Sequence, residues 1–109
     1  MRVSDQVEAA LEAADTDRLL LIREHAEGYE CFPLLGRYES VYVLTYGEEK
    51  LDALLADTQI GEQKDITILI TNTKADAQTF QNWESGHGFE DEMDVLCKTG
   101  KYEVIKWHK

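Results

Sequence analysis

The sequence predicts a single α/β domain, residues 1–109, in which a mixed four- to five-stranded sheet packs with about three helices. Three observations lead to this fold class. Short apolar segments alternate with longer segments of helical periodicity, a hairpin signal closes the chain, and 109 residues with 43% hydrophobic content suffice for one core. A two-layer α+β sandwich is the alternative architecture that the same pattern permits.

The first predicted element is a helix from Ser4 to Ala14, with the Ser4 hydroxyl as its N-cap. Apolar residues at helical spacing form one face of this helix: Val3, Val7, Ala10, Leu11 and Ala14. A second face carries acids alone, at steps of three, four and three: Asp5, Glu8, Glu12 and Asp15. We call these four residues the acidic ridge.

Apolar residues on both faces indicate three strands, at Arg18 to Glu24, Val41 to Tyr46 and Ile66 to Thr71. The β-branched and aromatic residues of 41–46 predict a central strand. The apolar patch from Tyr29 to Leu35 contains Pro33, and we expect a short strand or a packed loop there. Strands with two apolar faces favour helices on both sides of the sheet.

Two further helices are predicted between and after these strands. Thr45-x-x-Glu48 forms a capping box that opens a helix to about Asp57. Thr73-x-x-Asp76 resembles a second capping box, and its helix extends to about Glu84.

The C-terminal segment reads as a β-hairpin. Asp94 to Lys98 and Tyr102 to His108 flank Thr99-Gly100, a tight-turn signal. The complete order is therefore α-β-(β)-β-α-β-α-β-β. It predicts right-handed crossovers and a partly parallel sheet whose last two strands are antiparallel.

The charge of the chain is strongly acidic and unevenly distributed. There are 22 Asp and Glu against 11 Lys and Arg, a net charge of −11. Residues 1–97 hold 21 of the acids and seven of the bases, and the last twelve residues hold one acid and four bases. Such a chain repels itself and nucleic acid, and it favours a cationic partner.

A second acidic segment, Glu84 to Asp94, contains five acids and no Lys or Arg. Its two glycines and its charge predict an exposed loop, in which Phe89 is an apolar anchor with a charged rim. A simpler interpretation is that this segment is only a solvated connection. The corresponding simpler interpretation of the acidic ridge is a solvated helix face. The residues expected to bind a partner are Asp5, Glu8, Glu12, Asp15, Glu84, Phe89, Glu90, Asp91, Glu92 and Asp94.

The sequence offers little basis for catalysis or for a cofactor. Metal ligands are too few around His87, and glycines stand where an EF-hand loop needs ligands. Cys31 and Cys97 lack redox or metal spacing, which predicts two free thiols. We expect neither metal nor cofactor, and not an enzyme. No run of apolar residues is long enough to span a membrane, and no secretory signal is visible, so a cytoplasmic protein is expected.

The preferred functional hypothesis is a small non-enzymatic acidic protein that binds and neutralises a basic protein. The type expected is an immunity protein or an anti-defence inhibitor. Covering a nucleic-acid-binding or catalytic surface of the partner, or mimicry of nucleic acid, is a specific form of this hypothesis. A small ligand-sensing domain, acidic only for solubility, is the alternative. Its pocket is expected at the carboxyl ends of the parallel strands, near Gly47 and Asn72-Thr73. A small enzyme and a homodimer remain open.

Overall fold

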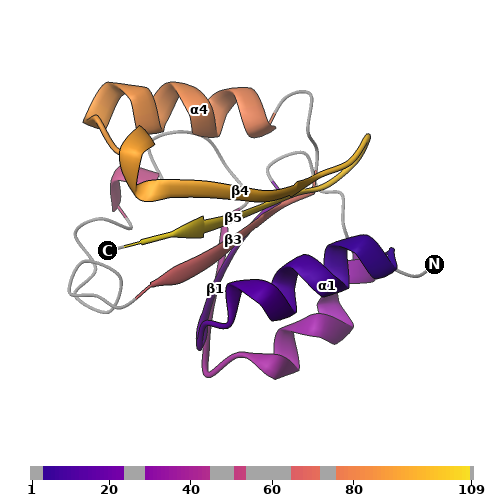
Figure 1. The fold of residues 1–109 in the computed structure, drawn as a ribbon. Coiled ribbons are helices and arrows are strands. Elements are labelled where there is room, and N and C mark those ends of the chain that lie inside the picture. The colour runs from indigo at the N-terminus through magenta and orange to yellow at the C-terminus, as the bar shows by residue number, and fades with distance from the viewer. Residues whose placement is uncertain (1–3, 24–28, 45–50, 54–64, 72–75, 109) are drawn as a thin grey trace.

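Five strands form one mixed sheet in a computed structural model of the chain (Figure 1). The structure describes residues 4–23, 29–44, 51–53, 65–71 and 76–108. In chain order its elements are α1 (Asp5–Ala14), β1 (Arg18–Ile22), the 3-10 helix η1 (Tyr29–Arg37), β2 (Ser40–Leu44), β3 (Ile66–Ile70), α4 (Asp76–His87), the 3-10 helix η2 (Glu90–Glu92), β4 (Met93–Lys98) and β5 (Glu103–Trp107). The strand order is β2-β1-β3-β5-β4, in which β1, β2 and β3 are parallel and β5 is antiparallel to both of its neighbours. The predicted α/β class is confirmed.

β3 is the centre of the sheet, and all five of its residues are buried. Its isoleucines face a core that includes Phe80 and Trp83 of α4. Leu69 faces a second core, built with α1 and η1. Helical elements therefore cover both faces, as Figure 1 shows, and the fold has three layers rather than the two of the alternative sandwich.

α1 begins and ends where the sequence predicts. The Ser4 hydroxyl accepts a hydrogen bond from the Val7 amide at 3.3 Å and caps the first turn. At the other end Asp15 has a left-handed backbone (φ 50°), and its amide donates to the Leu11 carbonyl at 3.4 Å. The apolar face predicted between Val7 and Ala14 is buried against β4 and β5.

β2 lies at an edge of the sheet, so the prediction of a central strand at 41–46 is wrong. The connection from β1 leads outward to β2, and the next strand in the chain, β3, lies on the other side of β1. Tyr42 still packs on the α4 side, but Val43 on the other side is 46% exposed. Apolar residues on both faces are thus compatible with an edge position when one face is only partly covered.

The segment around Pro33 is a 3-10 helix, neither the strand nor the loop that was expected. Cys31 and Leu34, three residues apart, are both buried on the α1 side. A 3-10 helix has three residues per turn, so this spacing places both side chains toward the core.

The other predicted elements are the C-terminal hairpin, the helix at 48–57 and the two capping boxes, and the structure describes only some of their residues. The C-terminal hairpin is confirmed, and the Thr99 hydroxyl accepts from the Tyr102 amide at 2.8 Å in its turn. An unpredicted bulge shifts the register between Val95 and Cys97. Of the helix predicted at 48–57, the structure describes 51–53, which are helical. Both capping boxes include residues outside the described chain.

A buried carboxylate ties the hairpin turn to η1. The Glu30 side chain, 11% exposed, accepts hydrogen bonds from the Lys101 ammonium at 2.6 Å and from the Tyr102 hydroxyl. These two donors, Lys101 first, lower the pKa of Glu30 from 4.5 to about 2. The contact joins segments that are 71 residues apart in the chain.

Because β3 is central and β2 lies at an edge, truncating a side chain should lower the free energy of unfolding by different amounts in the two strands. Ile68→Ala should lower the free energy of unfolding by about 2–5 kcal/mol, because Ile68 is fully buried in β3 and its loss leaves a cavity. Val43→Ala on the exposed side of β2 should cost less than about 1 kcal/mol. Urea denaturation of the two variants measures both values. Similar losses would contradict the assignment of centre and edge.

The Glu30 contact predicts acid sensitivity. Because its folded pKa of about 2 lies below the ordinary value of 4.5, the stabilisation is present above pH 4.5 and disappears as the pH falls toward 2. Glu30→Gln should remove this pH dependence and cost about 1–3 kcal/mol at pH 7 through its lost ionic hydrogen bonds. Exposed Glu39→Gln is the control. Urea denaturation at pH 7, 4 and 3 tests this, and equal losses in both variants at pH 7 would refute it.

Candidate functional site

The two acidic segments lie on opposite faces of the sheet. The acidic ridge belongs to α1, which packs on the core of Leu69 and Val104. The segment Glu84–Asp94 ends α4 and passes through η2 on the other core, against which Phe89 packs. The structure therefore does not combine the two segments into a single face (Figure 1).

Both segments nevertheless end at the same edge of the sheet. α1 leads into β1 through a short turn, and η2 leads into β4, whose Met93 pairs with Trp107 beside the start of β3 (Figure 1). The amino ends of the three parallel strands form this edge. The acids gathered along it, called the acidic edge below, are Asp15, Asp17, Glu39, Asp65, Glu90, Asp91, Glu92 and Asp94.

Acids outnumber bases strongly along this edge. Near it the described residues include three bases, Arg18, Arg37 and Lys106, so eight acids against three bases leave a charge of −5 with histidine neutral. Six of the eight acids are exposed, and Asp65 and Glu92 are half-buried. Neighbouring strands lie about 4.8 Å apart, so the edge of five strands spans roughly 19 Å.

The middle of the acidic edge is internally paired. Asp65 lies 3.8 Å from the Lys106 ammonium and 3.8 Å from His108 Nδ1, and Asp94 contacts His108 Nε2 at 2.5 Å. Five other acids have no side-chain hydrogen bond or ion pair within the described chain: Asp15, Asp17, Glu39, Glu90 and Asp91. The acids without a side-chain partner therefore lie on both sides of an internally paired centre.

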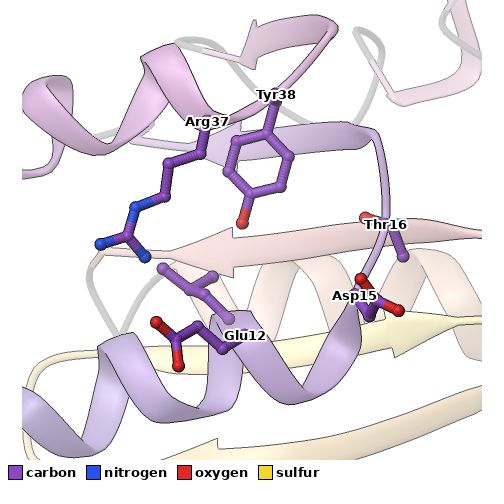
Figure 2. A pocket seen from close by; sticks show the side chains of 6 residues that line it. Glu12, Asp15, Thr16, Arg37 and Tyr38 are labelled. Carbon is purple, nitrogen blue, oxygen red and sulfur yellow. The ribbon is translucent and has the colours of Figure 1, made fainter.

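Two open pockets adjoin this edge beside the end of α1. The first has a volume of about 340 Å³, and Figure 2 shows Arg37 and Tyr38 on one side of it and Glu12 and Asp15 on the other. Burial raises the pKa of the Tyr38 hydroxyl. The second pocket, about 210 Å³, is lined by Asp15, Thr16, Asp17 and Asp65. Carboxylates dominate the second pocket, whereas the first offers both charge signs.

The rest of the ridge has no common environment. Glu8 pairs with Arg37 at 3.6 Å, and Glu12 is exposed at the first pocket. Asp5 is exposed at the opposite end of α1, far along the helix from the acidic edge. Only Asp15 of the ridge therefore belongs to the edge.

Residues 84–94 do not form the exposed loop that was predicted. They comprise the last turn of α4, the turn at Gly88, η2 and the start of β4. Phe89 is half-buried because its ring stacks on His87 at 5.2 Å and contacts Trp107 at 5.2 Å. Phe89 thus supports the core on the α4 side, and a role as a partner's anchor stays a prediction.

Two acids of this segment are also partly used within the fold. Glu92 accepts a hydrogen bond from the Trp107 indole at 3.1 Å. Burial, and then the nearby carboxylates of Glu90 and Glu103, raise the pKa of Glu84. Glu90 and Asp91 are exposed and lack the histidine contact that exposed Asp94 makes, so they form the part of the segment most available to a partner.

Three acids of the edge were missed in the sequence. Asp17, Glu39 and Asp65 each stand immediately before the first residue of a parallel strand. Parallel strands bring their amino ends to one side, so this recurrence was a usable signal. Knowing that the three strands are parallel would have been enough to predict that these three acids lie along one edge.

The described residues show no alternative chemical centre. Within them, no group of three His, Cys, Asp or Glu is placed to hold a metal ion, and no helix is long and apolar enough to cross a membrane. Cys31 and Cys97 are buried free thiols, and burial raises the pKa of Cys31 to about 11. A thiol with a raised pKa is a poor nucleophile.

No protein-family model, curated protein or solved structure matches this chain. The acidic edge is therefore the feature from which a function has to be inferred.

Proposed function

We propose that this protein is a small non-enzymatic acidic protein that binds and neutralises a basic protein partner, and that the acidic edge is its docking surface. One observation supports the proposal above all. Acids from four separate stretches of chain converge on one edge, and five of those acids have no side-chain partner within the described residues.

Uncompensated like charges favour a cationic partner for a physical reason. Carboxylates held near one another repel, and a basic surface replaces that repulsion with attraction. The Debye length is about 8 Å at physiological ionic strength, so the edge acts on a basic protein that comes within about that distance. The main expected effect is faster association and choice of partner.

The charge sign and geometry narrow the class of partner. Direct binding to nucleic acid is disfavoured because phosphates would meet carboxylates. A basic protein that itself holds nucleic acid fits better. The edge of roughly 19 Å matches the rise of about five or six nucleotides on one strand. Toxins and nucleic-acid-handling enzymes are the partners proposed, as for immunity proteins and anti-defence inhibitors, in a cytoplasm that keeps Cys31 and Cys97 reduced.

A ligand-sensing domain is the second candidate. The position expected for its pocket, near Gly47 and Asn72-Thr73, lies outside the described residues. The pocket beside Glu12 and Arg37, about 340 Å³, favours this candidate because its volume is within the range of small-molecule sites. Thermal stabilisation by a metabolite would support it, and a flat response across a broad library would count against it.

Two variants of equal charge distinguish the acidic edge from the ridge. The edge variant combines Asp17→Asn and Glu39→Gln, and the control combines Asp5→Asn and Glu12→Gln. All four residues are exposed, and each pair changes the net charge by two. The partner is first captured at low salt from the organism that makes the protein, and association rates are then measured.

The edge variant should associate roughly 3–10-fold more slowly at low salt, and the control should stay within about twofold. The difference should shrink at 0.5 M salt because exposed charges are screened. Melting temperatures of both variants should remain close to that of the parent. Equal slowing by both variants, or a captured partner that is not basic, would contradict the proposal.

A further inference from the structure

Within the described residues, no other strand pairs with the outer edge of β2. The Ser40 amide donates to the Asp17 carbonyl at 3.2 Å, and the Arg23 amide donates to the Leu44 carbonyl at 2.9 Å. Residues 40 and 44 therefore face β1, and so does Tyr42 by the alternation of a parallel ladder. The N–H and C=O groups of Val41 and Val43 consequently point away from the sheet.

β2 lacks the features that usually protect such an edge. It has no charged residue and no proline, and it pairs with β1 at five successive positions without a bulge. The other terminal strand, β4, has a register shift at Val95/Cys97 and carries Asp94 and Lys98. Charges and bulges block the addition of a further strand. Of the two edges, β2 is thus the one open to strand addition.

Exposed apolar side chains accompany the open edge. Val43 is 46% exposed, and its register partner Leu21 places it on the side of η1. On that same side η1 exposes Tyr29 by 64% and Phe32 by 41%, with their rings 5.6 Å apart. An added strand presents every second side chain to one face. An apolar residue at one of those positions would therefore meet Val43.

We infer that β2 binds an extended segment of the basic partner, which joins the sheet as a sixth strand. The inference rests on the proposed function and specifies how the partner is held. The segment would have apolar residues at alternate positions and basic residues toward the amino end of β2. There it would meet Glu39 and Asp17, so the open edge continues directly onto the acidic edge.

Charge selects a basic segment over a second copy of this chain. A dimer through β2 would bring together two molecules that each carry −11, and no ion pair within β2 offsets this repulsion. A basic segment instead gains attraction along the same path. Main-chain hydrogen bonds supply affinity in strand addition, and side chains supply selectivity.

The probe is an eight-residue peptide of alternating valine and lysine with blocked ends. Its matched control carries an N-methyl group on every backbone amide, which removes the donors on both edges of the peptide and leaves the charge unchanged. A valine–glutamate peptide controls for charge. At low salt the unmethylated basic peptide should bind at least tenfold more tightly than either control, and hydrogen exchange of the Val41 and Val43 amides, measured by NMR, should slow at least tenfold.

Variants of one residue test the same contact from the side of the protein. Val43→Pro removes an outward amide donor of β2 and should weaken binding of the unmethylated peptide at least tenfold, whereas Val43→Ala keeps the amide and should weaken binding less than threefold. If Val43→Pro does not fold, the comparison of peptides on the parent protein still decides the question.

Equal binding of the methylated and unmethylated peptides, with unchanged exchange at Val41 and Val43, would overturn strand addition while leaving charge-driven binding intact. Failure of both peptides to bind would also overturn it. Protection of Val41 and Val43 that grows with protein concentration alone would assign the edge to a second copy and overturn the inference. The proposed function is tested separately by the capture experiment, and it fails if no basic protein is captured.

Discussion

The burial of β3 on both faces is the constraint on which the rest of the structure depends. Its five residues have no solvent-facing side, so a layer of helix must cover each face. α1 and η1 supply one layer and α4 the other. α1 and α4 run back against the parallel strands, so their carboxyl ends arrive at the strands' amino ends. Acids placed in the turns there are kept out of the core, and the same geometry concentrates them on one edge.

The charged residues at the two ends of the parallel strands differ in how they are paired. Near the carboxyl ends of the parallel strands, charged groups contact other groups of the fold. The Arg23 guanidinium lies 4.5 Å from the Tyr29 ring, and buried Glu103 lies 3.8 Å from the Lys98 ammonium. At the acidic edge, exposed acids such as Asp17 and Glu39 have no such contact in the described part of the chain. This asymmetry supports the proposal that the amino-end edge, and not the whole acidic surface, meets a partner.

Local patterns were predictable from sequence, whereas positions within the sheet were not. Helical periodicity and the Ser4 cap define α1, and Thr99-Gly100 defines the hairpin, because short-range contacts determine both. The edge position of β2 depends on crossovers between distant segments, which its own apolar residues do not encode. Phe89 was predicted to be exposed because acids surround it, but its ring packs on His87 and Trp107 from other elements. The acidic edge was predictable only in part. The acidic ridge and the segment Glu84–Asp94 were identified from the sequence, but grouping the acids that precede the strands required the strand directions.

Backbone hydrogen exchange of the protein bound to its captured basic partner tests the central claim most directly. The account predicts slower exchange at 15–17, 37–44 and 90–94 in the complex, with little change along the outward side of α4 at 78–82. These segments are distant in sequence and share only the acidic edge and the adjoining edge of β2. Protection confined to α4, or to the first turns of α1 with the acidic edge unchanged, would contradict the account.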